Sequence, residues 1–149
     1  MKKRIAALIL AALLLLCEPL AASALTYEQC SKAKPEEIWN YLMDKIGNPY
    51  GVAGIMANIS YESGLIPNNL NNGSNRSLGL TDAEYTSRVD SGAYKNFVND
   101  GAYYGLAQWG YRTRKQGLLN LAKEMDGSVG SLEVQLAFLM KELEERGII

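Results

Sequence analysis

The sequence of 149 residues contains no histidine and only two cysteines. Without histidine, catalytic triads that depend on an imidazole base and metal sites with imidazole ligands are excluded. Cys17 lies in an N-terminal segment that we expect to be removed, so that Cys30 alone would remain and no disulfide could form within the mature chain. We therefore expect no metal and no cofactor, and we expect Cys30 to be a free or partner-paired thiol without a catalytic role.

The chain also lacks a strong excess of charge of either sign. It has 15 basic and 16 acidic residues, a formal net charge of -1. Removal of residues 1–24 would leave 12 basic and 15 acidic residues and a net charge of -3. A protein that binds nucleic acid normally carries a basic face, so the composition indicates no nucleic-acid partner.

Residues 1–24 have the organisation of a secretory signal peptide. A basic start, "MKKR", precedes an apolar run, and Ala22-Ser23-Ala24 has the spacing of small residues at a cleavage site. The run is interrupted at residues 17–19 before it reaches the roughly 20 apolar residues that a membrane-spanning helix needs. We predict cleavage near Ala24, export to the cell exterior or envelope, and no stable membrane anchor afterwards.

The rest of the chain is predicted to be a short lead-in, residues 25–34, followed by one mainly helical domain, residues 35–149. Apolar residues at helical spacing predict helices over residues 35–46, 50–63 and 131–145, and another that begins near Arg112. The asparagine-rich stretch from Asn68 to Asn75 is predicted to be a polar loop. The following residues, up to about 100, show no clear period and are predicted to form a small irregular lobe beside a cleft.

Glu62, in the stretch "NISYESGLIPNN", is the main candidate for an acid with a chemical role. It follows Ile55 by seven residues and Ile59 by three, a spacing that predicts a place on the apolar face of its helix. Apolar surroundings disfavour a charged carboxylate, and an acid that keeps its proton can donate it to a glycosidic oxygen. The alternative is a hydrated charge at a helix end, which is what most such glutamates are.

The neighbouring residues are suited to sugars. The amides of the asparagine-rich loop can pair with sugar hydroxyls, and Tyr103, Tyr104 and Trp109 offer flat apolar faces to pyranose rings. For each aromatic residue, packing in the core is the alternative.

Two stretches together resemble a known family. "IMANISYESGLIPN" and, downstream, "DGAYYGLAQWGYRTRKQGLL" resemble the phage-tail-type lysozyme-like family, and the pair is similar to signatures of soluble lytic transglycosylases and goose-type lysozymes. The resemblance runs from about Ile38 to the C-terminus and implies a lysozyme-like helical domain that cleaves peptidoglycan. It departs from the family at Ala57, where glycine is common. Relatives usually continue with another helix, so we expect the domain to be truncated at its C-terminus.

The resemblance also implies roles for particular residues. Glu62 corresponds to the catalytic acid, and Ser63 supports its position. Gln108 faces the sugar from the opposite wall of the groove, with Tyr104 and Trp109 as its neighbours.

Three basic residues that follow could hold peptidoglycan carboxylates or could form a solvated helix start: Arg112, Arg114 and Lys115.

A second carboxylate would decide the type of reaction. An inverting hydrolase needs a base about 6.5–9.5 Å from the acid, and a retaining hydrolase needs a nucleophile at about 5–5.5 Å. Asp100 is preferred because goose-type enzymes carry an aspartate at a similar place, although it could simply cap a turn. If no carboxylate reaches the site, the N-acetyl group or the 6-hydroxyl of the sugar could complete the reaction, and the latter would give an anhydro product. The other candidates are Asp82, Glu84 and Asp90.

The predicted activity is cleavage between N-acetylmuramic acid and N-acetylglucosamine in peptidoglycan strands, as a muramidase or a lytic transglycosylase. A catalytically inactive module that binds or assembles cell-wall saccharides is the alternative. An amidase or peptidase is disfavoured because those chemistries normally need histidine. Whether the protein assists a secretion, conjugation or phage-like machine stays open.

Overall fold

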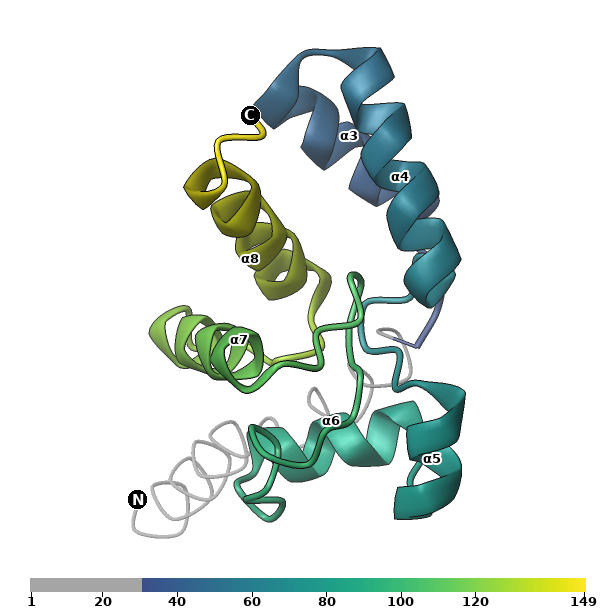
Figure 1. Cartoon of the computed structure of the whole chain (residues 1–149), viewed down its shortest axis with the longest axis vertical. Coiled ribbons are helices and arrows are strands. Elements are labelled where there is room, and N and C mark those ends of the chain that lie inside the picture. Colours follow the sequence, from purple (N-terminus) through teal and green to yellow (C-terminus); the bar gives the residue numbers. More distant parts are fainter. Residues whose placement is uncertain (1–30) are drawn as a thin grey trace, which may run out of the picture.

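The computed structural model describes residues 31–149, which are mainly helical, as predicted (Figure 1). The predicted signal peptide, the start of the lead-in and Cys30 lie outside the described residues. No helix within the described part is long and apolar enough to cross a membrane. The helices are α3 (Pro35–Ile46), α4 (Pro49–Ser63), α5 (Asn72–Leu78), α6 (Asp82–Asp90), α7 (Arg112–Glu124) and α8 (Leu132–Glu145).

Helices α3 and α4 form a hairpin, and three consecutive residues form the sharp turn between them (Figure 1). Gly47 ends α3 in the left-handed region, with φ 67°, where glycine carries no steric penalty. The side chain of Asn48 then caps α4 by accepting hydrogen bonds from two backbone N–H groups, and Pro49 occupies the first turn. The predicted bounds of α3 are confirmed.

Two short helices make up about half of the region predicted as a polar loop and an irregular lobe. The prediction of a loop through Asn75 was wrong from residue 72 onward, because the side chain of Asn71 accepts a hydrogen bond from Gly73 N at 2.9 Å and starts α5. Helix α6 begins with a capping box between Thr81 and Glu84. Capping, rather than a long apolar stripe, defines both helices, and the chain from residue 91 to 111 is irregular apart from its bridges.

Helices α7 and α8 pack against each other and supply much of the core. Their contact is close at Gly117, where an added Cβ would lie 2.9 Å from the ring of Phe138. Helix α8 starts at the cap Ser131, whose side chain accepts a hydrogen bond from Val134 N. The predicted start of α7 and span of α8 are confirmed. Glu142 of α8 is buried, unlike the exposed Glu144 and Glu145 on the same helix.

The segment after α4 lies beside the segment before α7 (Figure 1). Leu70 and Tyr104 form an antiparallel bridge, and Asn71 N donates to Tyr103 O at 3.0 Å. The turn between α7 and α8 closes over this pairing at Gly130, where an added Cβ would lie 2.6 Å from the Tyr104 hydroxyl. The two sequence motifs, more than 30 residues apart, are thereby brought side by side.

Candidate active site

Glu62 lies in the last turn of α4 and is exposed. The expectation that it extends the buried face was wrong: α4 buries Val52, Ile59 and Ser63. Successive residues of a helix are rotated by about 100°, so burial of position 63 turns position 62 toward solvent. Within residues 31–149, the Glu62 carboxylate has no hydrogen bond or ion pair. It is therefore free to meet a ligand.

The backbone turns sharply directly after Glu62. Gly64 ends α4 with φ 63°, and Leu65 follows with φ 63°, also in the left-handed region. Such a conformation costs a leucine about 1–2 kcal/mol, because its Cβ approaches the next carbonyl oxygen. The Leu65 carbonyl is held by Lys34 N at 3.0 Å. The turn carries the chain away from the helix and leaves Glu62 at an exposed corner.

Ser63 lies in the core, with 3% of its surface exposed. Its Oγ donates a hydrogen bond of 2.9 Å to the carbonyl of Ile59, one turn earlier. Ser63 therefore contacts the backbone of the last helical turn, and it offers no hydroxyl to a substrate on the surface.

Gln108 joins the two motif segments to each other. Its Nε2 lies 3.0 Å from Gly105 O, 3.1 Å from Asn69 O and 3.0 Å from Asn69 Oδ1. Its backbone is in the left-handed region, with φ 46°, and its Oε1 is buried without a partner among the described residues. The side chain expected to face the sugar thus holds the loop beside Glu62's segment, and its amide nitrogen is already engaged.

Tyr104 and Trp109 are core residues, each with 0% of its surface exposed. The hydroxyl of Tyr104 lies 2.6 Å from Thr86 Oγ1, and Trp109 Nε1 donates to Glu142 Oε2 at 2.8 Å. The expectation that these rings present flat faces to sugars was wrong, and core packing describes them. They shape the segment from inside the fold.

Two tyrosines, Tyr61 and Tyr103, expose their rings on the two segments that carry the motifs. Tyr103 is 49% exposed, as expected for the neighbour of buried Tyr104 in an extended segment whose side chains alternate. Tyr61, next to Glu62 on α4, is 91% exposed. Sequence reasoning did not single out Tyr61. Exposed tyrosine rings of this kind are suited to stacking with pyranose rings.

Arg114 forms a bidentate pair with Glu142 under the Trp109 ring. Nε and Nη2 of Arg114 each lie 2.6 Å from an oxygen of the Glu142 carboxylate. Burial acts to raise the pKa of Glu142, but the hydrogen bonds from Arg114 and Trp109 hold this pKa below its ordinary value. Neither expectation for Arg114 holds, because its guanidinium is neither a solvated charge nor free to bind peptidoglycan carboxylates.

Replacement of Glu142 by glutamine is expected to lower the free energy of unfolding by about 1–3 kcal/mol near pH 7 and by less as the pH is lowered below 4.5. Because the pKa of Glu142 is lowered from its ordinary value of 4.5, the ionised carboxylate stabilises the fold at pH values above 4.5. This stabilisation is lost as the pH falls through the lower folded-state pKa. Urea unfolding of both proteins near pH 7, 5 and 3 measures the difference. Glu144→Gln, exposed on the same helix, is the control, and a cost independent of pH would contradict the assignment.

Asp100 is held in a buried cluster. Lys115 Nζ lies 2.6 Å from Asp100 Oδ1, and the Tyr85 hydroxyl donates to Oδ2 at 2.6 Å. Ala102 N donates to Oδ1 at 2.9 Å. The side chains of Lys115 and Asp100 are 0% and 2% exposed. Lys115, expected near a solvated helix start, is therefore a core residue, and the alternative role of Asp100 as a structural residue describes its contacts.

The pKa values of this cluster follow from burial. Burial lowers the pKa of the Lys115 ammonium, and the Asp100 carboxylate opposes this effect. Burial and the hydrogen bond to Asp100 raise the pKa of the Tyr85 hydroxyl. Asp100 thus faces three donors inside the fold, whereas a catalytic base needs a free lone pair directed at its substrate.

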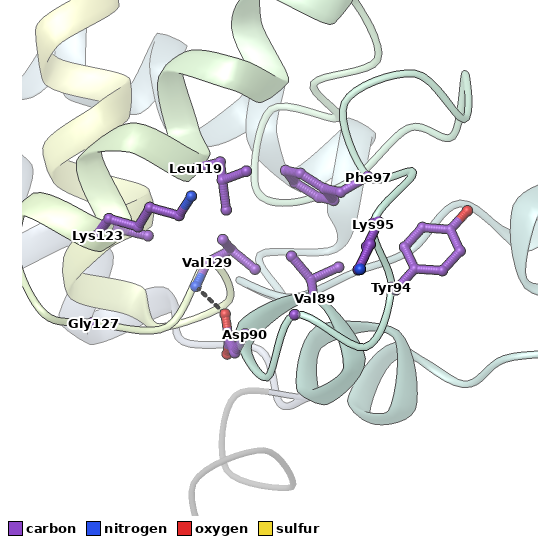
Figure 2. Close-up of a pocket in the computed structure, with 11 residues that line it drawn as sticks. Val89, Asp90, Tyr94, Lys95, Phe97, Leu119, Lys123, Gly127 and Val129 are labelled. Atoms are coloured by element: carbon purple, nitrogen blue, oxygen red, sulfur yellow. Dashed lines mark hydrogen bonds between the residues drawn. The ribbon is translucent and has the colours of Figure 1, made fainter.

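The other three candidate carboxylates also have partners within the fold. Asp82 Oδ1 accepts hydrogen bonds from Leu70 N at 3.1 Å and Asn75 Nδ2 at 3.2 Å. Glu84 belongs to the capping box of α6. Asp90 Oδ1 accepts a hydrogen bond of 3.0 Å from Val129 N, drawn as a dashed line in Figure 2. Each of the three shapes the lobe around α6.

The asparagines expected to meet sugars instead organise their own loop. Asn68 is buried and donates from Nδ2 to Ser31 Oγ at 2.9 Å. Asn71 caps α5, and Asn75 Nδ2 donates to Leu80 O at 2.9 Å. The amides of these three asparagines thus stabilise the loop.

Comparison with known protein families gives the class of the protein. The family described as phage tail lysozyme matches residues 33–147, nearly all of the described chain. The chain belongs to this family, and the resemblance drawn from its two motifs is confirmed. No significant match was found among curated proteins or among solved structures. Membership supports a lysozyme-like, peptidoglycan-cleaving role in general, with peptidoglycan as the substrate.

Proposed function

We propose that the protein is a lytic transglycosylase that cleaves peptidoglycan strands between N-acetylmuramic acid and N-acetylglucosamine, with Glu62 as the acid. The observation that carries this proposal is the contrast among the carboxylates. Glu62 is exposed and has no partner within residues 31–149, whereas the four candidates for a second carboxylate are all hydrogen-bonded to neighbouring residues. The substrate's own 6-hydroxyl then takes the place of a protein nucleophile.

The reaction needs one carboxyl group in two protonation states. Glu62 donates its proton to the bridging oxygen as the bond from that oxygen to C1 of N-acetylmuramic acid breaks. The resulting carboxylate accepts the proton of the 6-hydroxyl as O6 bonds to C1 of the same sugar. The products are a free 4-hydroxyl on N-acetylglucosamine and a 1,6-anhydro ring, and Glu62 regains its proton.

Substrate binding supplies the environment that free Glu62 lacks. A glycan strand lying over the end of α4 removes water from the carboxyl, and desolvation favours its uncharged, protonated form. The exposed rings of Tyr61 and Tyr103 are suited to stack on the sugars that cover it. We further propose that the protein acts outside the cytoplasm, where its substrate lies and where the predicted signal peptide would direct it.

Mass spectrometry of the soluble products from purified peptidoglycan tests the proposal. We expect muropeptides that end in anhydro-N-acetylmuramic acid, each lighter by one water than its reducing-end counterpart. Reducing ends as the main product would contradict the transglycosylase assignment and would require a water-activating group.

A second candidate function is binding of cell-wall saccharides without cleavage. The exposure of Glu62 among the described residues favours it, because a general acid in a glycosidase is usually shielded from water by the groups around it. Binding of chitooligosaccharides by the wild-type protein, with no muropeptide released from peptidoglycan, would support this function instead.

A further inference from the structure

A cavity lies between α6, α7 and the chain that follows each of them (Figure 2). Its volume is about 310 Å³, at the small end of the range for ligand sites. Neither Glu62 nor any residue from 58–69 or 103–109 lines it. Its apolar floor consists of Val89, Phe97, Leu119, Ala122 and Val129.

Two lysines stand at the rim of this floor. In Figure 2, Lys123 from α7 and Lys95 from the loop after α6 lie on either side of Val89 and Val129. Both lysines are exposed, and neither has a hydrogen bond or ion pair within residues 31–149. Asp90 also lines the cavity, and its Oδ1 accepts a hydrogen bond from Val129 N at 3.0 Å. The rim therefore offers two ammonium groups and one carboxylate around an apolar surface, an excess of positive charge.

This combination selects a particular ligand chemistry. Apolar walls bind small alkyl side chains by excluding water from them, and unpaired ammonium groups bind a carboxylate through charge-assisted hydrogen bonds. A glycan fits poorly, because the floor of Val89, Leu119 and Ala122 offers no donors or acceptors to sugar hydroxyls. A short peptide with small side chains and a free C-terminal carboxylate fits both features and the volume.

We propose that this cavity binds the C-terminal carboxylate end of an alanine-rich peptide of the kind that branches from peptidoglycan strands. The source of the peptide rests on the proposed function, but its binding does not require Glu62. The cavity would then hold the peptide branch while the strand is cleaved at a separate place on the molecule.

Titration with the N-acetylated tripeptide L-Ala-D-Ala-D-Ala, followed by amide NMR spectra, tests the proposal. We expect saturable shifts of the signals of residues that line the cavity, including Val129 and Leu119. The same peptide with a C-terminal amide should bind about tenfold more weakly, because it lacks the charge that the lysines recognise. Equal binding of the two peptides, or no saturable shift, would overturn the proposal.

Variants of the two rim lysines test whether they bind the carboxylate of the peptide. Lys95→Gln combined with Lys123→Gln should weaken acid binding about tenfold and leave the thermal unfolding of the protein nearly unchanged, since both side chains are exposed. Lys45→Gln, on exposed α3 surface, is the matched control and should bind as the wild type does. Unchanged binding in the double variant would also overturn the proposal.

The Glu62→Gln variant separates this inference from the proposed function. It should bind the tripeptide with the wild-type affinity whether or not it cleaves glycan strands. Peptide binding without any glycan cleavage by the wild type would reject the enzyme and keep the peptide site. Cleavage of glycan strands without binding of the peptide would reject the peptide site and keep the enzyme.

Discussion

Replacement of Glu62 by glutamine is expected to reduce the release of soluble muropeptides by at least about a thousandfold, because glutamine has no proton to transfer. The same carboxyl serves as acid and then as base in the proposed reaction, so both steps lose their catalyst. Glycan binding should change little, since glutamine keeps the shape of the side chain. Product release from purified peptidoglycan and chitooligosaccharide titration measure the two effects.

Stability measurements show whether the loss is chemical. Glu62 is exposed and unpartnered within the described chain, so the free energy of unfolding should change by less than about 0.5 kcal/mol. Glu124→Gln, an exposed glutamate in the last turn of α7, is a matched control and should remain fully active. Turnover retained by a clean preparation of Glu62→Gln would contradict the assignment of Glu62 as the acid.

Replacement of Lys115 by methionine is expected to lower the free energy of unfolding by about 3–5 kcal/mol. The methionine fills similar space but leaves the Asp100 carboxylate buried without its cation, and removal of one partner of a buried ion pair has a cost of this size. Small domains have only about 5–15 kcal/mol of stability in total. Urea unfolding near pH 7 measures the loss, and Lys141→Met, exposed on α8, is the control.

A double variant keeps this prediction testable even if the single variant is barely folded. Asp100→Asn retains an acceptor for Tyr85 and removes the charge. Combined with Lys115→Met, it should recover at least about 1 kcal/mol relative to the sum of the two single changes, because no buried charge is left alone. Strictly additive costs would show that Lys115 and Asp100 do not stabilise each other.

Helices with strong local signals could be predicted from the sequence. The bounds of α3 follow from Pro35 at its start and Gly47 at its end, and these signals act within a few residues. Helix α5 could not be predicted from an apolar period, since its seven residues bury none of their side chains. It forms because Asn71 caps it and Gly79 ends it, and the same residue types are equally common in loops.

The two segments that form the candidate site could be predicted from the sequence, but which of their side chains face solvent could not. The two motifs indicated that residues near Glu62 and Gln108 belong to one site, and the bridge between Leu70 and Tyr104 places their segments together. Which side chains face solvent depends on how distant segments pack. The packing of α8 buries Trp109 through Glu142, a contact across 33 residues that no local pattern contains.

The pairing of the two motif segments has a consequence for the order of events during synthesis. Glu62 and all of α4 precede residue 64, but the loop that holds their surroundings ends with Trp109, and the Gly130 turn and α8 close over it later in the chain. A nascent chain that has emerged only as far as α6 carries Glu62 without the segment that pairs with its surroundings. The proposed activity is therefore expected to depend on completion of the fold, and early fragments released by a stalled ribosome or a protease should be inert.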